Sequence, residues 1–428
     1  MKISRIISVL LLCPVFLQGQ DYEIANWLDD KSSATVLTFD DWSPGHGPIV
    51  VPQLISKKLP GTFFVVANSV WKPQDYTIMS NAMTHGIEIA NHSKTHPDLT
   101  TLDSAGLETE VNGNKTVLES HVPKLNIITF AYPFGAENEM VRKKVMEKHI
   151  ASRGVSQPSL WKYSLNETHN KYFDLGTVVM SSSVTGKAFT NHVKKGIKDG
   201  GLVTFLFHSV YSSSVNDNWA YPVKDSLLIE CLDSLKTYED QTWVTTVRDA
   251  ILYHSEKKSA QLSFISETDT LWRLSFTDAL PDSIYNHALT IKLKIPQGKV
   301  AALVMQGNDT LASYIKGKPI MFNAVPDGGE ISIVLVEDNS VAIMSSIQQE
   351  NVFPNPTTGQ FNLKINSDKD FQATVKIYDS NGKELLSFVD VVQKGENIFP
   401  VAEKLSAGNY FVSISGEGAA KSYKVVVK

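Results

Sequence analysis

The stretch Ala34-Thr35-Val36-Leu37-Thr38-Phe39-Asp40-Asp41 joins an apolar, strand-like run to two adjacent carboxylates. A second apolar run, Ile87–Ala90, leads in the same way to His92-Ser93-Lys94-Thr95-His96. In a barrel of parallel strands the chemistry gathers at the C-terminal strand ends, so we expect these side chains to lie together. Two imidazoles and one carboxylate can hold a divalent metal and leave a position open for water. The two stretches therefore predict a metal-assisted hydrolytic site.

The candidate metal ligands are Asp41, His92 and His96, and Asp40 is the candidate general base. Positions i and i+4 face the same way on a helical turn, so a helical turn is expected between the two histidines. Neighbouring strand residues point to opposite faces, so Asp40 and Asp41 can serve one site only at the strand end. The ligand set suits Zn²⁺, although Co²⁺, Ni²⁺ or Fe²⁺ could bind it as well. If the histidines were only capping or core residues, the aspartate pair would remain unexplained.

Strand-like and helix-like segments alternate from Ser33 to about Lys257. This alternation predicts an α/β fold with a parallel sheet, closed or nearly closed into a barrel with its helices outside. Helices are expected at 137–149, 188–198 and 224–235. The expected strands are 34–39, 62–66, 87–91, 127–132, 151–155, 177–181, 202–208 and 243–247.

Four motifs, in this order, resemble those of the polysaccharide deacetylases (carbohydrate esterase family 4, with its NodB-type homology domain). They are Thr38–Asp41, His92–His96, Phe130-Ala131-Tyr132-Pro133-Phe134-Gly135 and Leu206-Phe207-His208-Ser209. The resemblance covers roughly residues 33–255 and implies a distorted (β/α) barrel. It also implies His208 as the general acid that protonates the leaving amine; the alternative is a buried structural histidine.

The resemblance suggests further roles around the third motif. It gives the oxyanion-holding backbone N–H to Phe134, with Tyr132 beside the substrate. The family arginine that orients the base falls on Ala131 here, so its task is either absent or done by another residue. Arg153, at the end of the next expected strand, is the candidate; otherwise it is an ordinary surface or helix-packing arginine.

Two more residues near the aspartates and histidines are of interest. Ser93, inside the histidine motif, is a candidate supporting residue. Trp42 stands where the family has glycine, and it could be a sugar platform beside the metal or a lid on the barrel.

Composition and the N-terminal sequence indicate the number of domains, the kind of partner and the export of the protein. With 428 residues the chain should hold two or three domains, and a net charge of −5 argues against nucleic acid as the main partner. Lys2 and Arg5 followed by the apolar run 6–17 predict a signal peptide over 1–20, and no later segment is apolar enough for a membrane span. A lipoprotein anchor at Cys13 is the alternative. If the signal peptide is removed together with Cys13, Cys231 is the sole thiol of the mature chain, and we expect it to be buried on a helix.

The remainder of the chain alternates with the period of β-strands. Residues 259–345 are expected to form a β-sandwich that is a spacer or accessory domain. Its Trp272, Tyr285 and Tyr314 could stack on sugars or could belong to the core or an interface. Residues 346–428 resemble the type A C-terminal sorting domain of the type IX secretion system of Bacteroidetes. That resemblance rests on Val352–Gly359, the Asn381-Gly382 turn, Leu405–Val412 and the tail Lys424–Lys428.

The predicted organisation is a signal peptide (1–20), a deacetylase barrel (21–258), a β-sandwich (259–345) and a sorting domain (346–428). The predicted function is hydrolysis of acetyl groups from an external N-acetylated glycan: chitin-like, peptidoglycan or poly-N-acetylglucosamine. The protein is expected to act as a monomer at the cell surface or outside the cell, after export by the type IX machinery. Alternatives are an O-acetyl xylan esterase, a non-catalytic glycan-binding surface protein, and a hydrolase of small cyclic amides.

Overall fold

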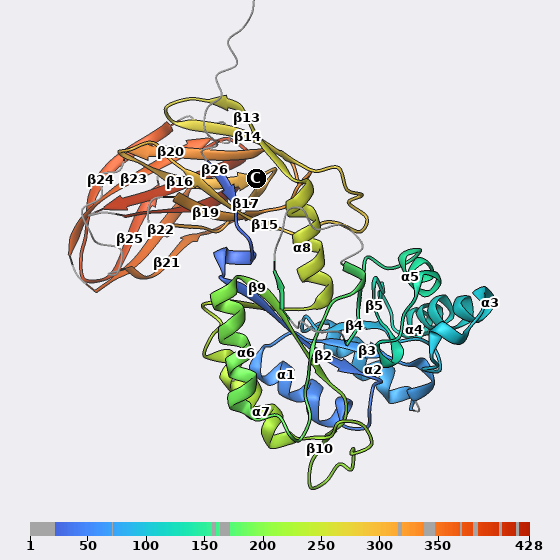
Figure 1. Ribbon diagram of the computed structural model, residues 1–428. Helices are drawn as coiled ribbons and strands as arrows, with labels where there is room; N and C mark the ends of the chain where they lie inside the picture. The colour runs from blue at the N-terminus through green and yellow to red at the C-terminus, as the bar shows by residue number, and fades with distance from the viewer. Residues whose placement is uncertain are drawn as a thin grey trace, which may run out of the picture.

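The structure is a computed structural model of the chain. It describes residues 22–70, 72–155, 160–162, 172–315, 319–337, 347–368, 370–379, 384–401, 405–416 and 419–428 (Figure 1). The expected signal peptide, with Cys13, and the Asn381-Gly382 turn lie outside these residues.

A curled nine-stranded sheet forms the first unit and confirms the predicted distorted (β/α) barrel. Its strands run in the order β6-β5-β4-β3-β2-β9-β7, while β12 also pairs with β2 and β8 with β9. All of these pairs are parallel except β7–β9, and a bridge between Arg153 and Leu175 brings β6 close to the segment before β8. The strands are β2 Ser33–Asp40, β3 Thr62–Val65, β4 Glu88–Asn91, β5 Thr129–Ala131, β6 Ala151–Arg153, β7 Leu160–Lys162, β8 Val178–Val179, β9 Gly201–Phe207 and β12 Thr242–Thr245.

The helices lie outside this sheet, with α1, α6 and α7 packed together (Figure 1). The three expected helices appear as α5, α6 and α7, and Cys231 is buried on α7 as predicted. Two short strands, β10 Val210–Tyr211 and β11 Val223–Lys224, pair beside the barrel mouth. The helices are α1 Val51–Lys57, α2 Pro73–Met83, α3 Ser104–Leu107, α4 Gly113–His121, α5 Glu139–Met146, α6 Gly186–Asp199, α7 Asp225–Lys236 and α8 Val247–Ser259.

Apolar side chains cover both faces of the sheet, as in other parallel sheets. All eight residues of β2 are buried. On one face, Phe39 packs with the helix residues Leu54 and Leu228. On the other face, Val36 packs with Phe130 in a core inside the barrel. Burial on both faces fixes the register of β2 and therefore the place where its polar end, Asp40, emerges.

The middle part of the chain is a sandwich of two antiparallel sheets, as expected. Trp272 is buried in its core, which supports the core interpretation of this residue, and Tyr285 packs against the barrel. The side chain of Tyr314 lies outside the described residues. The sheets are β1-β15-β19-β18 and β13-β14-β20-β16-β17, built from β1 Tyr22–Ile24, β13 Gln261–Glu267, β14 Leu271–Thr277, β15 Leu289–Lys294, β16 Lys299–Gln306, β17 Asp309–Thr310, β18 Ser313–Ile315, β19 Pro319–Ala324 and β20 Ile331–Glu337.

The barrel domain was expected to begin at residue 21, but the strand β1 does not belong to the barrel sheet. It pairs antiparallel with β15 of the middle sandwich, Tyr22 opposite Leu293. Tyr253 of α8 is buried in the core of that sandwich and donates a hydrogen bond from its hydroxyl to the carbonyl of Ala25, at 2.9 Å. The first residues after the expected leader therefore belong to the middle sandwich and tie it to the barrel.

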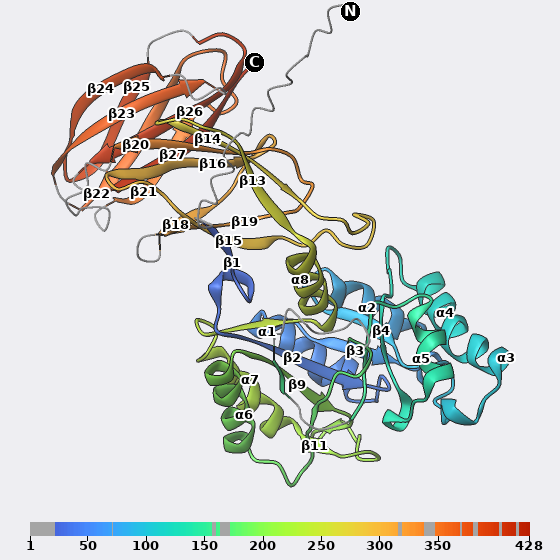
Figure 2. The same ribbon diagram turned by 45° about the horizontal axis from the view of Figure 1, so that its top comes forward.

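A second antiparallel sandwich closes the described chain (Figure 2). Phe411 and Tyr378 of this unit are buried against Leu303 and Met305 of the middle sandwich. None of the helices in the described ranges has the length and apolarity needed to cross a bilayer. The sheets are β21-β22-β25 and β24-β23-β26-β27, from β21 Ile347–Phe353, β22 Phe361–Ser367, β23 Phe371–Asp379, β24 Glu384–Val392, β25 Gly395–Val401, β26 Gly408–Gly416 and β27 Ala419–Val427.

Candidate active site

The aspartate pair lies where β2 ends. Asp40 is the last residue of β2, and the next two residues, Asp41 and Trp42, have φ values of 74° and 57°. Two successive left-handed residues turn the chain sharply, so the strand alternation ends between the two aspartates. Both carboxylates are buried and both approach the same imidazole, at 3.5 Å from Nε2 of His92.

The histidines lie on a loop, and the expected helical turn between them is wrong. Residues 92–98 carry no helix, and Ser93 and His96 have φ values of 63° and 60°. Ser93 helps to close this loop because its hydroxyl accepts the backbone N–H of His96, at 3.0 Å. The loop still brings His96 to the pair, with its Nε2 at 3.5 Å from Oδ1 of Asp41.

The three expected ligands come together. One donor atom from each of Asp41, His92 and His96 lies within 4.8 Å of the others. The Nδ1–H of His92 donates to the carbonyl of Ala131, at 2.8 Å, which leaves the lone pair on Nε2 facing the aspartates. A second hydrogen bond of this kind commonly fixes the tautomer of a metal-bound histidine. The donors thus fit a divalent cation.

The charges around the pair support the same conclusion. Burial and the neighbouring Asp40 raise the pKa of Asp41 to about 7. Burial lowers the pKa of His92 to about 3, so this imidazole is neutral near pH 7. Arg153 compensates the charge of Asp40, and a divalent cation would compensate that of Asp41, which faces neutral imidazoles.

Arg153 lies on β6 and reaches the candidate base. Its guanidinium is buried and donates a hydrogen bond to Oδ2 of Asp40. Burial acts to raise the pKa of Asp40, but Arg153, His92 and His208 outweigh it and lower this pKa below the ordinary carboxyl value. The arginine therefore keeps Asp40 ionised, and it does so from a different strand than Ala131 on β5.

His208 lies just after β9, with its Nε2 at 3.9 Å from Oδ2 of Asp40. Burial lowers its pKa, although Asp40 acts in the opposite direction. Its backbone carbonyl accepts a hydrogen bond from Nε2–H of His46, at 2.8 Å. The imidazole is 15% exposed, so it is open to a bound molecule, unlike Asp40.

The expected substrate residues differ in how far they reach solvent. Phe134 is 67% exposed and has a φ of 59°, and its ring lies 4.6 Å from the His96 ring. Tyr132 is buried, and its hydroxyl donates to the carbonyl of Phe173, at 3.2 Å. Trp42 is buried against Phe63, which favours the lid over the sugar platform.

Glu110 is a residue that sequence reasoning missed. Its buried carboxylate accepts the backbone N–H groups of Lys94 and Thr95, at 3.0 and 2.8 Å, and the hydroxyl of Thr95, at 2.8 Å. These three bonds hold the loop that carries His96. Glu110 lies in the short helical segment Glu108–Asn112 between α3 and α4. The sequence gives no signal for this contact, because the partners of the carboxylate are mainly backbone N–H groups of a distant loop.

Asp217 is the second residue that was missed. Its Oδ2 accepts the hydroxyl of Ser43, at 2.6 Å, and the backbone N–H groups of Gly45 and Val210, at 2.9 and 3.0 Å. It therefore joins the loop after Asp41 to the loop after His208.

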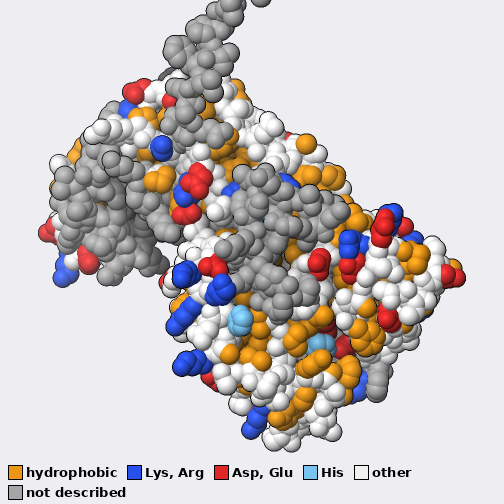
Figure 3. Space-filling model, in the orientation of Figure 1, with side chains coloured by type: hydrophobic (Ala, Val, Ile, Leu, Met, Phe, Trp, Pro, Cys, Tyr) orange, Lys and Arg blue, Asp and Glu red, His pale blue; other side chains and the backbone are white. Residues whose placement is uncertain are grey.

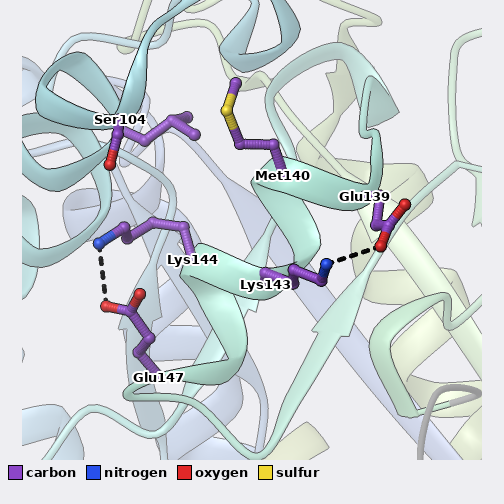
Figure 4. A pocket seen from close by; sticks show the side chains of 7 residues that line it. Ser104, Glu139, Met140, Lys143, Lys144 and Glu147 are labelled. Atoms are coloured by element: carbon purple, nitrogen blue, oxygen red, sulfur yellow. Dashed lines mark hydrogen bonds and ion pairs between the residues drawn. The ribbon is translucent and has the colours of Figure 1, made fainter.

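Histidine side chains appear among apolar ones on the surface of the barrel in Figure 3, where positive and negative side chains are otherwise interspersed. A separate hollow of about 460 Å³ lies over α5 (Figure 4). Its charges are already paired, Lys143 with Glu139 and Lys144 with Glu147. This hollow therefore offers no uncompensated charge to a ligand.

Comparison with known families agrees with this geometry. A model described as "Polysaccharide deacetylase" matches residues 28–151, which include the aspartate pair and both histidines. This part of the chain belongs to the polysaccharide deacetylase family. A model described as "Secretion system C-terminal sorting domain" matches residues 351–428, so the last sandwich is a sorting domain.

Curated relatives match parts of this chain. It is 33% identical over 120 residues to a chitooligosaccharide deacetylase of Rhizobium leguminosarum bv. trifolii, covering 28% of this chain and 53% of the relative. It is 25% identical over 346 residues to a gellan lyase of a Bacillus species, covering 74% of this chain and 13% of the relative. The chain thus spans about half of one relative and a small part of the other.

Among solved structures, the Xyl-CE4 domain of a multidomain xylanase from the hindgut metagenome of Trinervitermes trinervoides aligns with 19% identity. The alignment covers 51% of this chain and 89% of that domain, with a TM-score of 0.36.

We expect one divalent cation per chain, removed by the substitution His92→Ala. Loss of this imidazole leaves only Asp41 and His96, so the affinity for zinc should fall by more than ~100-fold. Elemental analysis of the purified protein and competition with a chromogenic chelator would measure this. The substitution His85→Ala, of an exposed histidine at the end of α2, is the matched control. Equal metal content in both variants would contradict the assignment.

We expect Glu110→Ala to weaken the affinity for zinc by about 10–100-fold, the usual effect of residues that orient metal ligands. The reason is that three hydrogen bonds to the His96 loop are lost. Glu108→Ala, which removes an exposed carboxylate two residues away, should leave the affinity unchanged. The same chelator competition measures both, and identical affinities would show that the loop holds its shape without Glu110.

Proposed function

We propose that this chain is a secreted, metal-dependent deacetylase that removes acetyl groups from an external N-acetylated glycan. The observation that carries the proposal is the meeting of Asp40, its partner Arg153 and the open imidazole of His208 beside the three ligand donors. The chitooligosaccharide deacetylase and chitin deacetylases among the partial matches act on glycans of this kind by name, which supports the substrate class.

A divalent cation held by Asp41, His92 and His96 would polarise the acetyl carbonyl and make a water molecule more acidic. We assign the cation as zinc, because two neutral imidazoles and a carboxylate are typical zinc ligands. The tautomer of His92, held by the Ala131 carbonyl, keeps the required lone pair in place.

The chain's own residues would then divide the proton transfers. Asp40, kept ionised by Arg153, accepts a proton as water attacks the acetyl carbon. His208 gives a proton to the amine nitrogen as the carbon–nitrogen bond breaks, and acetate and a free amine result. Burial lowers the pKa of His208, so its protonated form is a stronger acid toward the leaving group. The exposed turn at Phe134 supplies the backbone N–H that holds the oxyanion.

The sorting domain supports the location of the reaction. Export by the type IX machinery through residues 346–428 would place the barrel at the cell surface or outside the cell, where polymeric glycans are found. Such substrates fit a site that opens at the barrel mouth. We propose that the protein acts there as a monomer.

The central prediction is acetate release from an N-acetylated glycan. The purified chain with added zinc should release acetate from at least one of chitooligosaccharides, peptidoglycan and poly-N-acetylglucosamine. Asp40→Asn should lower the rate by about 10²–10⁴-fold, because no group remains to take the proton. An enzyme-coupled acetate assay measures both.

The control for this experiment is the metal content of Asp40→Asn, which should equal that of the unaltered chain, since Asp40 is not a ligand. Acetylated xylan is the comparison substrate. Acetate release from xylan alone would mean that the hydrolysed bond is an ester and not an amide. If the zinc-loaded chain released no acetate from any of these polymers, the proposed activity would be wrong and glycan binding without turnover would replace it.

A separate prediction concerns Arg153. Arg153→Met should reduce acetate release by roughly 10²-fold, because Asp40 loses both its orientation and its compensating charge. Arg142→Met, which removes a partly exposed arginine paired with Glu137, is the matched control. Steady-state rates would be compared after checking that both variants keep the circular dichroism of the unaltered chain. Full activity of a folded Arg153→Met would show that Asp40 does not need Arg153 for its orientation or its charge.

A further inference from the structure

Two large aromatic side chains stand in solvent on the loop that follows His208. Trp219 is 63% exposed and Tyr221 is 58% exposed. The Tyr221 ring lies 5.2 Å from the His208 ring, with 43° between their planes. Exposed rings of this size leave apolar area in water without a protein partner, so a cluster of them beside a catalytic site indicates a binding surface.

The loop that carries them, residues 209–223, is held in one conformation by hydrogen bonds. The backbone N–H of Ser209 donates to the carbonyl of Ala220, and the N–H of Val223 donates to the carbonyl of Ser209, at 3.1 and 2.9 Å. The hydroxyl of Ser209 also accepts the N–H of Ala220, at 3.2 Å. Asp217, two residues before Trp219, is buried in the contact with Ser43 and Gly45. The two rings are therefore presented by a fixed backbone, which lowers the entropy lost when a ligand binds.

The backbone of Tyr221 supports this interpretation. Its φ of 44° lies in the left-handed region, which is unfavourable for a residue with a bulky side chain. Such conformations persist where the surrounding structure enforces them, and they concentrate at ligand-binding sites. The left-handed turn directs the ring to His208, where it contacts the expected acid.

A third exposed ring borders the site at another ligand loop. Phe134, 67% exposed, packs edge-on to His96, with ring centroids 4.6 Å apart. Rings thus stand beside His96 and beside His208, the two imidazoles most open to solvent among the site residues. A ligand long enough to pass over both histidines would meet an aromatic face at each.

We propose that Trp219 and Tyr221 form a sugar-binding subsite, in which each ring stacks on the apolar face of a pyranose next to the one being deacetylated. The inference rests on the proposed function and narrows it: the substrate is an oligomer or polymer, and an isolated sugar would leave the subsite empty. Aromatic rings suit this task because they offer a broad apolar face at low conformational cost.

The test measures binding by the full chain carrying Asp40→Asn, so that turnover does not consume the ligand. Isothermal titration calorimetry with the hexamer of β-1,4-linked N-acetylglucosamine should give tighter binding than with the monomer. Trp219→Ala and Tyr221→Ala should each weaken hexamer binding by about 3–10-fold, the value of one stacking contact. Trp219→Phe, which keeps a ring, should recover most of the affinity.

The matched control is Phe264→Ala, a substitution of an exposed ring on β13 of the middle sandwich, which should leave hexamer binding unchanged. Equal hexamer affinity of the Asp40→Asn chain with and without Trp219→Ala would overturn the subsite, as would an absence of hexamer binding altogether. Loss of binding in the two loop variants supports it even if the unaltered chain releases no acetate. A failure of the deacetylase assignment is thereby distinguished from a failure of the subsite.

Discussion

The contact between Arg153 and Asp40 is the interaction on which the active site depends. Arg153 ends β6 and Asp40 ends β2, and three strands separate them in the sheet. Neighbouring strands lie about 4.8 Å apart, so in a flat sheet these two residues would stand about 19 Å from each other. The hydrogen bond between them exists only because the sheet curls, and the bridge from Arg153 to Leu175 continues the same curvature. The proposed chemistry therefore requires the barrel shape. Only a curled sheet can bring the buried guanidinium of Arg153 to the buried carboxylate of Asp40, which lies several strands away.

Several residues at the mouth of the barrel adopt the left-handed backbone conformation, which is unfavourable for residues other than glycine. Left-handed conformations cost roughly 1–2 kcal/mol for each residue other than glycine. Glu110 offsets part of this cost at the histidine loop by accepting two backbone N–H groups and a hydroxyl. Its side chain lies outside the metal-ligand set, yet the position of His96 depends on it. Five residues of the site adopt this conformation: Asp41, Trp42, Ser93, His96 and Phe134.

Apolar patterning predicted eight of the nine strands described in the barrel sheet, because strands such as β2 and β9 are buried throughout and appear as apolar runs; the short strand β7 was not predicted. The ligand trio was predictable for the same reason, since Asp41, His92 and His96 follow such runs. The loop between the histidines was not, because its shape comes from a carboxylate more than a dozen residues away. The placement of β1 was also missed: a three-residue strand has no periodicity, and its partner β15 lies far along the chain, with Tyr22 opposite Leu293.

Asp217 connects the parts of the site that sequence reasoning treats one at a time. It lies in the same loop as Trp219 and Tyr221, and its carboxylate accepts backbone N–H groups from the segments that follow the adjacent strands β2 and β9. Gly45 is required at this junction, since a Cβ there would lie 1.8 Å from the carbonyl oxygen of Val210. The close approach lets His46 donate to the carbonyl of His208, so the turn that carries the aspartate pair also holds the proposed acid. A shift of the aromatic loop would therefore move His208 relative to Asp40, so the proposed sugar subsite and the proposed proton transfer share one hydrogen-bonded support.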